Sequence, residues 1–314
     1  MASRFTPCLI ADNGKESTCD GFFRSSLFYE AEHVTHTLCI REGSDAVLAI
    51  PLIVRPIPGT DFMDAISPYG FPGGTVRKPA CVELKRLDWS PTGLVSIFLR
   101  NRIGPPPVIV DGSNRGTVQI VDPTRPLSIR RNHRCDIKRN TALGYTTEIV
   151  PGPSSSREEQ KGFREMYWQT MERQGARPWY LFSEEYFEVI LKSDLSWLVL
   201  TRDPGGTLAA GIHVVYSDTM LHCYLAGTAD EFLRHSPGKN AFFTAIEMAQ
   251  ERNLPLNLGG GMRPGDSLEH FKVGFANHTE PFFTHEIVCD PSAYCLLSRT
   301  QTKTDFFPVY RSSP

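Results

Sequence analysis

The chain of 314 residues lacks several features that would place it quickly in a class of protein. No run of apolar residues approaches the roughly 18 that a membrane span needs. The opening residues, MASRFTPCLIAD, contain no apolar segment typical of a secretory signal. The formal net charge is only −2, so no global field draws the chain to nucleic acid or membrane. We therefore expect a cytoplasmic protein without membrane association, in which any polyanion site is local.

Several short motifs are also missing. The eight cysteines form no C-x-x-C pair and no regular framework, so we expect free thiols rather than disulfides. His33 and His36 have a spacing that suits a metal, but no further ligand lies nearby, and we expect no metal. G-x-S-x-G and G-x-G-x-x-G are absent, so neither a hydrolase elbow nor a dinucleotide fingerprint is supported.

What is present is the composition of an ordinary globular protein. Hydrophobic residues make up 40% of the chain and charged residues 22%. The length allows one large core or two smaller ones. Pro151-Gly152-Pro153, followed by three serines, is typical of a linker. We therefore predict two domains, residues 1–150 and 151–314.

Hydrophobic periodicity predicts a regular order of elements in the second half. The predicted strands are 144–150, 196–201, 207–217, 219–226, 255–258 and 282–289. The predicted helices are 157–175, one capped by Ser183, one over 240–252 capped by Asn240, and a short one around 266–274. The resulting order is β-α-α-β-β-β-α-β-α-β.

The first half shows a weaker version of the same pattern. Its predicted strands are 36–40, 46–54, 106–111 and 117–121. A helix is predicted to start at Ser90, where proline follows, and a basic helix over 126–142 is predicted to end at Gly144. A duplicated mixed α/β unit accounts for this pattern, and a single α/β domain with a decorated N-terminal region is the alternative.

The element order of the second half is that of the GNAT acyltransferase fold, and two such units in one chain resemble the FemABX family. The segments that carry the resemblance are SPYGFPGG (67–74), RRNHRCDIKRNTALGY (130–145), FREMYWQTMERQGARPWYLFSEEYF (163–187) and NLGGGMRPGDSLEHFKVGF (257–275). The resemblance implies an α/β fold of two GNAT-like units with mixed central sheets. It also implies an aminoacyltransferase that forms an amide bond from aminoacyl-tRNA and an amine, with no bound cofactor.

One departure from the family concerns its long helical arm. No heptad stretch here is long enough to form it. A compact member would act on a small peptide-like acceptor with a free amine, as in peptidyl nucleoside antibiotic biosynthesis of the pacidamycin type. Two alternatives stay open: an acyl-CoA-dependent N-acyltransferase, and a non-catalytic tandem-GNAT binding protein.

Lys272 is the first candidate for catalysis. It lies between Phe271 and Val273, where apolar neighbours lower the local dielectric and strengthen the effect of its charge. The resemblance implies that Phe271 and Lys272 form the functional Phe-Lys pair of the family. An ammonium group here suits the tetrahedral oxyanion, the departing ribose oxygen or a phosphate. The alternative is a surface lysine on an amphipathic helix.

Further candidates are weaker. Gly259 and Gly260 let the backbone turn sharply and a substrate approach closely, or they form a flexible loop. Asp266 is a candidate general base or, alternatively, the cap of the next helix. Tyr224 and Tyr69 are candidates for hydrogen bonds to substrate, with packing as the alternative.

Basic residues cluster between 130 and 139. Arg130, Arg134 and Lys138 follow one helical face at i, i+4 and i+8, and Arg131 and Arg139 lie beside them. These five positive residues and one negative residue give a net charge of +4, as phosphate contacts require. We predict that they bind tRNA, with a solvated basic helix as the alternative.

The segment RHSPGKNAF (234–242) occupies the place where CoA-using GNAT enzymes carry a glycine-rich phosphate loop. Only Gly238 and either Arg234 or His235 fit that loop, and Lys239 and Asn240 interrupt it. We predict phosphate or tRNA contacts from Arg234, Gly238 and Lys239. An ordinary helix-start turn is the alternative.

Overall fold

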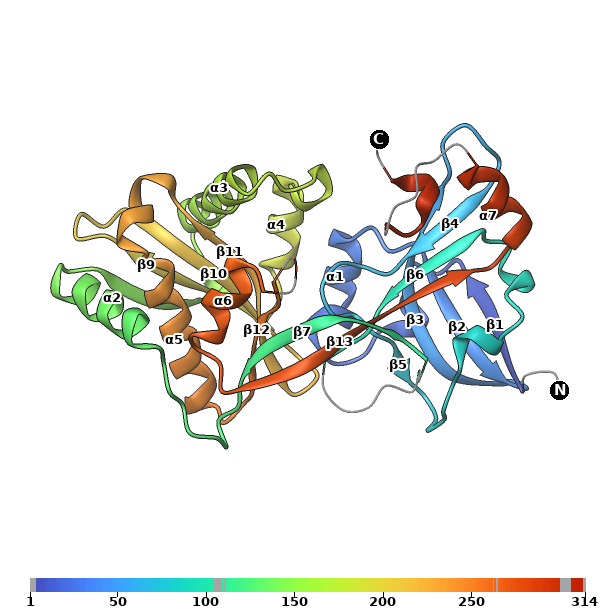
Figure 1. The fold of residues 1–314 in the computed structure, drawn as a ribbon, viewed down its shortest axis with the longest axis horizontal. Helices are drawn as coiled ribbons and strands as arrows, with labels where there is room; N and C mark the ends of the chain where they lie inside the picture. Colours follow the sequence, from blue (N-terminus) through green and yellow to red (C-terminus); the bar gives the residue numbers. More distant parts are fainter. Residues whose placement is uncertain are drawn as a thin grey trace. The chain divides into compact units, whose positions relative to one another are not determined.

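The computed structural model describes residues 4–103, 109, 111–261, 263, 265–299 and 306–312. The chain forms two compact units. The first unit comprises Met1–Arg115 and Pro281–Pro314, and the second comprises Gly116–Glu280 (Figure 1).

The second unit is built on a mixed sheet. Its strands are β8 (Thr146–Pro151), β9 (Ser196–Arg202), β10 (Leu208–Ser217), β11 (Met220–Thr228), β12 (Leu256–Gly259) and β7 (Ser113–Val121), in the order β8-β9-β10-β11-β12-β7. The pairings from β8 to β11 are antiparallel, β11 pairs with β12 in parallel, and β12 pairs with β7 antiparallel. The single parallel step therefore lies between β11 and β12.

The first unit repeats this sheet. Its strands are β1 (Phe5–Ile10), β2 (His36–Glu42), β3 (Asp45–Pro56), β4 (Met63–Ile66), β6 (Ser96–Arg100) and β13 (His278–Val288), in the order β1-β2-β3-β4-β6-β13. The pairings are again antiparallel up to β4, parallel between β4 and β6, and antiparallel between β6 and β13. A short β5 (Thr75–Val76) pairs with β3. This common strand order confirms the duplicated unit.

The last strand of each sheet is exchanged. β7 follows β6 in sequence but completes the second unit's sheet, whereas β13 follows β12 but completes the first unit's sheet. The predicted boundary between residues 150 and 151 is therefore wrong. Gly152 is not in a linker, because a Cβ there would meet the Ser196 hydroxyl and the Leu191 carbonyl of the second unit.

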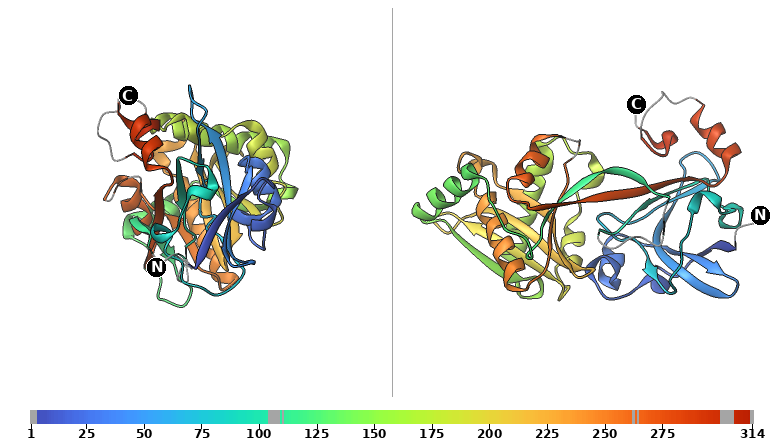
Figure 2. Two further views of the ribbon diagram at one scale, coloured as in Figure 1. Left: turned by 90° about the vertical axis from the view of Figure 1, so that its right-hand side faces the viewer. Right: turned by 60° about the horizontal axis from the view of Figure 1, so that its bottom comes forward.

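Helices cover both faces of the second unit's sheet. α3 (Arg157–Arg173) and α4 (Glu184–Ile190) belong to one face, and α2 (Arg131–Ala142) and α5 (Gly238–Glu251) lie together on the other (Figures 1 and 2). Successive residues of β10 show the division, because strand side chains alternate between faces. Gly211 lies against Phe163 of α3, whereas Ile212 belongs to the apolar core shared with α5.

The predicted order of elements in the second half is confirmed, with α6 (Ser267–Val273) as its last helix and β13 as its last strand. Three details were wrong. The basic helix begins at Arg131, because Arg130 is extended, and it belongs to the second unit. Pro237, not Asn240, is the N-cap of α5.

Helices are fewer in the described part of the first unit, where they are α1 (Ser26–Ala31) and α7 (Pro291–Ser298). The helix predicted at Ser90 is a single 3-10 turn, because Gly93 adopts φ +66° and ends it before β6. Most of the predicted strand 106–111 lies outside the described residues. The 3-10 turns of the chain are Lys15–Ser17, Phe22–Arg24, Leu84–Arg86, Ser90–Thr92, Gly152–Ser154, Pro178–Tyr180, Asp230–His235 and Val309–Arg311. Among the described residues, the helices lack the length and apolar character that crossing a bilayer requires.

Candidate active site

Three glycines connect β12 to α6, and close packing explains each of them. Gly259 adopts φ +81°, and a Cβ there would lie 2.8 Å from Lys272 Nζ. A Cβ on Gly260 would lie 2.7 Å from the Thr117 carbonyl oxygen, and one on Gly261 would lie 2.5 Å from Asp266 Oδ1. The sharp turn at Gly259 is confirmed. Protein atoms occupy the space beside Gly259 and Gly260, so a substrate contact from either glycine stays a prediction.

Lys272 points back at this turn from α6. Its Nζ donates a hydrogen bond of 2.7 Å to the Gly260 carbonyl. Burial lowers the pKa of Lys272 to about 8, although Cys223 and Asp266 nearby act in the opposite direction. Among the described residues, no carboxylate lies within ion-pair distance of Lys272 and no other group accepts a hydrogen bond from it. The side chain is half-buried, so the ammonium group is partly desolvated and keeps two N–H donors for a ligand.

Asp266 starts the helix that carries Lys272. Its Oδ1 accepts from the Glu269 N–H at 2.8 Å, and its Oδ2 accepts from the Arg263 N–H at 2.9 Å. The predicted N-cap is therefore confirmed. Because each oxygen already accepts a backbone hydrogen bond, the geometry favours the cap over a general base.

Phe271 packs among three aromatic rings. Its ring lies 5.2 Å from Phe242 of α5, 5.3 Å from His133 of α2 and 5.5 Å from Phe275. The residue is half-buried. Its predicted contact with substrate is untested, and what the structure gives Phe271 is a role in fixing the position of α6.

Tyr224 lies in β11 and is 8% exposed. Its hydroxyl is 2.5 Å from the hydroxyl of Tyr186 in α4, and its ring lies 6.0 Å from His213. Tyr224 thus packs among buried side chains that carry polar groups. A hydrogen bond from Tyr224 to substrate stays a prediction.

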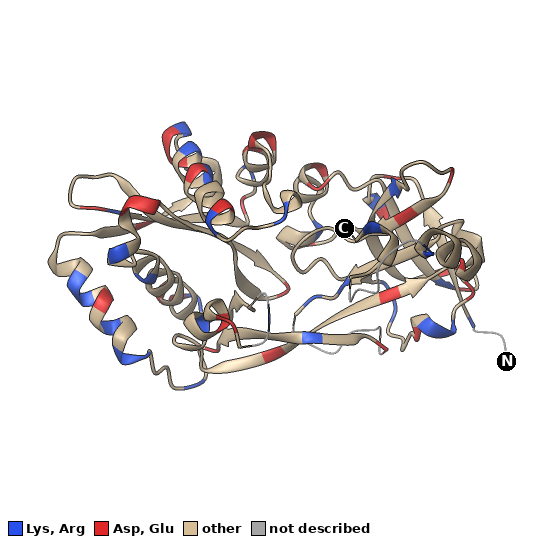
Figure 3. Ribbon diagram, turned by 45° about the horizontal axis from the view of Figure 1, so that its top comes forward, with Lys and Arg blue, Asp and Glu red and all other residues tan. Residues whose placement is uncertain are grey.

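Basic residues gather along α2 (Figure 3), and their side chains separate into two groups by their contacts. Arg131, Arg134 and Lys138 are exposed and make no ion pair among the described residues. Arg139 pairs with Asp136 at 3.0 Å. Arg130 precedes the helix, and its Nη1 donates to the His270 carbonyl at 3.2 Å. The predicted face of Arg130, Arg134 and Lys138 is therefore wrong, and Arg131 takes the place of Arg130 in the exposed group.

The start of α5 lies beside the end of α2. Lys239 Nζ donates to Asp136 Oδ2 at 2.5 Å. Burial opposes ionisation of Asp136, but Lys239 and Arg139 hold its pKa below the usual range. Arg234 Nε donates to His235 Nε2 at 2.9 Å, and Gly238 faces the Thr228 hydroxyl. Lys239 and Arg139 are thus partly neutralised by the protein, which weakens them as phosphate ligands.

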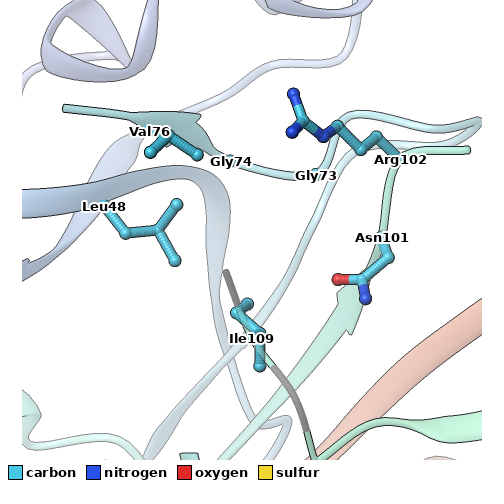
Figure 4. A pocket seen from close by; sticks show the side chains of 7 residues that line it. All are labelled: Leu48, Gly73, Gly74, Val76, Asn101, Arg102 and Ile109. Atoms are coloured by element: carbon cyan, nitrogen blue, oxygen red, sulfur yellow. The ribbon is translucent and has the colours of Figure 1, made fainter. Parts of the chain in front are cut away.

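Tyr69 belongs to the first unit, where its N–H donates to Glu32 Oε2 at 2.9 Å and Arg100 lies over its ring. The glycines of the same segment line a small pocket of that unit (Figure 4). The lining residues are Leu48, Gly73, Gly74, Val76, Asn101, Arg102 and Ile109. The tyrosine is thus held by its own unit, and its contact with substrate stays a prediction.

His133 was missed by sequence reasoning. It is buried on α2, and its Nε2 donates to the Phe271 carbonyl at 3.0 Å. His133, half-buried Ile137 and buried Asn140 follow at i, i+4 and i+7 within the basic segment. This spacing is typical of a packed helical face, and it was the available signal.

Comparison with known proteins now gives the class. Residues 128–272 match the family described as acetyltransferase (GNAT) domain. The match runs from the start of α2 through Lys272, so the second unit has the GNAT acyltransferase fold. No curated protein matches the sequence.

Solved structures share the fold of the whole chain. FemX is 13% identical, with 83% of this chain and 89% of that chain covered and a TM-score of 0.55. L-PGS from Bacillus licheniformis is 14% identical, with 91% and 94% covered and a TM-score of 0.56. The C-terminal domain of a putative lysylphosphatidylglycerol synthetase from Agrobacterium fabrum is 14% identical, with 86% and 88% covered and a TM-score of 0.55. The chain is therefore an α/β protein of two GNAT-like units, a fold that it shares with FemX and L-PGS.

Proposed function

We propose that the protein moves an amino acid from aminoacyl-tRNA to the amine of a small peptide-like acceptor, with Lys272 stabilising the transition state. One observation carries the proposal: the Lys272 ammonium is partly desolvated and, among the described residues, has a single hydrogen-bond acceptor, the Gly260 carbonyl. A buried charge without a compensating partner is costly, so such a group indicates a ligand of opposite charge.

The chemistry fits this group. The neutral acceptor amine attacks the ester carbonyl, a C–N bond forms, and the carbonyl oxygen becomes an oxyanion. The C–O bond to the ribose then breaks, and the departing oxygen takes a proton. Lys272 has two N–H donors left for either oxygen. A pKa of about 8 makes its proton easier to give up than that of an ordinary lysine. The proton that the acceptor amine loses when the amide forms replaces the one that Lys272 gives to the ribose oxygen.

Two features support tRNA as the donor. Arg131, Arg134 and Lys138 form an exposed basic group on α2, the helix that contacts α6, and such a group suits a phosphate backbone. The fold is also shared with FemX and L-PGS, and the sequence resembles the FemABX family. This donor would place the reaction in the cytoplasm. An acceptor of the peptidyl nucleoside kind agrees with the lack of a helical arm.

Acyl-CoA is the second candidate donor, because residues 128–272 match the acetyltransferase (GNAT) domain. The test offers radiolabelled aminoacyl-tRNAs and acyl-CoAs in parallel to a panel of amine acceptors, with and without ribonuclease. Product that ribonuclease abolishes supports the proposal. Product formed from an acyl-CoA and unaffected by ribonuclease would establish the second candidate.

A further inference from the structure

The end of α6 is held by residues from the start of α2. A helix of seven residues such as α6 is too short to be stable alone, and its last carbonyls need partners outside the helix. The Arg130 N–H donates to the Gly274 carbonyl at 2.8 Å, and Arg130 Nη1 donates to the His270 carbonyl. His133 Nε2 contacts the Phe271 carbonyl at 3.0 Å. The position of Lys272 therefore depends on α2.

His133 is the buried member of this set. A carbonyl can only accept, so Nε2 carries the proton. Burial, assisted by Lys239 and Arg130 and opposed by the Phe271 hydrogen bond and Asp136, lowers the pKa of the ring. Nδ1 is buried and has no partner among the described residues. Among the described residues, the ring therefore makes one hydrogen bond, which it donates to the carbonyl of Phe271, the residue before Lys272.

The ring is also fixed from two sides. It stacks on Phe275 with centroids 4.5 Å apart and planes at 28°. On another side lies Gly274, where a Cβ would fall 2.6 Å from the ring Cδ2 and closer still to Nε2. Phe275 and Gly274 lie within three residues of Lys272, so a movement of the ring is transmitted to the lysine.

We propose that His133 is a positioning residue for Lys272: its Nε2–H and its stacked ring hold α6 at the orientation that aims the ammonium at the reacting oxygen. The inference rests on the proposed function of Lys272. A displacement of about 1 Å can cost a positioned group on the order of 100-fold in rate. The loss should therefore appear in kcat and not in the affinity for either substrate.

The kinetic test compares His133→Phe with His133→Gln. Phenylalanine keeps the stacking but removes the donor, whereas glutamine places an N–H near the position of Nε2. We expect kcat to fall about 10-fold or more in His133→Phe, with each KM within about twofold, and to recover largely in His133→Gln. Asn132→Ala, at the exposed neighbouring position, is the control and should match the wild type. A folded His133→Phe with wild-type kcat would overturn the inference, provided that Lys272→Ala is inactive.

A second measurement does not depend on activity. Competitive labelling with acetic anhydride across pH, read by mass spectrometry of the peptide containing Lys272, follows the titration of its amine. We expect a midpoint near 8 in the wild type and in His133→Gln, and a shift toward 10.5, the ordinary value, in His133→Phe. An unchanged midpoint in His133→Phe contradicts the positioning role, even if Lys272→Ala proves active and the proposed function fails.

Gly274→Ala covers the case in which His133→Phe does not fold. Gly274 has an ordinary helical φ of −66°, so alanine is allowed by the backbone conformation. Its Cβ would push the His133 ring and would also lie 3.1 Å from the Phe271 carbonyl oxygen. We expect the same loss of kcat and the same shift in labelling. His133→Ala alone should show a similar loss, and adding Gly274→Ala to it should cause little further change, because the clash is then removed. A Gly274→Ala protein with wild-type kcat and labelling would overturn the proposal.

Discussion

The two units have the same strand order, yet the segments between their strands differ. Between the fourth strand and its parallel neighbour, the second unit has α5, whereas the first unit has β5 and two 3-10 turns. After the parallel strand, the second unit has α6 and Lys272, and the described residues between β6 and β7 contain no helix. The sheet is thus common to both units, and the proposed catalytic lysine lies in a connecting segment of the second unit.

Buried charge shows the same contrast. Asp64 in the first unit is fully buried, and it accepts from Arg55 at 3.0 Å, Arg311 at 2.5 Å and the Tyr310 hydroxyl at 3.2 Å. This network ties the C-terminal segment to β3 and β4. Lys272 in the second unit has one neutral acceptor. A satisfied buried charge serves stability, and an unsatisfied one indicates a ligand.

The largest expected effects come from removing these two charges. Lys272→Ala should fold normally and lose about 100-fold or more in kcat, because an oxyanion donor is removed. Asp64→Asn should lower stability by about 2 kcal/mol or more, because Arg55 and Arg311 lose their partner, while kcat of the folded fraction is kept. Steady-state kinetics and chemical denaturation measure both. Near-wild-type turnover in a folded Lys272→Ala protein would sink the assignment of the site.

Two left-handed glycines give the next comparison. Gly259→Ala in the second unit and Gly43→Ala in the first both place alanine at a positive φ, +81° and +61°, at a cost of about 1–2 kcal/mol each. Only Gly259→Ala also brings a Cβ against Lys272 Nζ, because the space beside Gly43 is open. We expect similar losses of stability but a kcat loss of about 10-fold in Gly259→Ala alone. Equal kcat values in Gly259→Ala and Gly43→Ala would show that Lys272 can be displaced without loss of activity.

A smaller effect is expected from the basic group of α2. Replacing Arg131, Arg134 and Lys138 by alanine should raise the donor KM and reduce the log-log salt slope by about one unit per lost phosphate contact. The contacts between α2 and α6 come from Arg130 and His133, which these substitutions leave in place. The acceptor KM should therefore stay nearly unchanged.

The control removes three exposed positive charges from the first unit: Arg77, Lys78 and Arg86. Donor affinity is measured against salt concentration for the wild type and both triple variants. Parallel salt slopes in all three proteins would mean that the α2 group is a solvated surface.

The smallest effect concerns one buried histidine in each unit. Burial lowers the pKa of His213 in the second unit to about 3 and that of His285 in the first unit to about 4. Both folded values lie below the ordinary 6.5, so each contribution to stability is complete above pH 6.5 and is lost as pH falls toward the folded value. Each histidine accounts for at most about 1.4 kcal/mol per pH unit.

His213→Gln and His285→Gln should each flatten the acid side of the stability curve, measured by urea denaturation between pH 4 and 8. The two slopes should fall by similar amounts, since both rings are buried. An unchanged slope in either variant would show that the corresponding ring is already protonated in the folded protein.

Local signals allowed much of the second unit to be predicted. Some features depend only on residues that are neighbours in the sequence. The structure confirms these: the helix caps at Ser183 and Asp266, the hairpin at residues 217–219 and the order of elements. The boundary near residue 150 failed because strand exchange joins segments distant in sequence. His133 was missed for the same reason, since its partner Phe271 is 138 residues away.

The exchanged strands also set an order of events during synthesis. The first unit needs residues 284–288 of β13 to cover the edge of β6, and these come near the end of the chain. At roughly 5–20 residues per second, the ribosome takes roughly 10–40 s between the two strands. For that time β6 presents unpaired N–H and C=O groups, which invite pairing with other chains. The usual rule that an N-terminal unit folds while the rest is being made does not apply, because the first unit needs a strand that is made after the second unit.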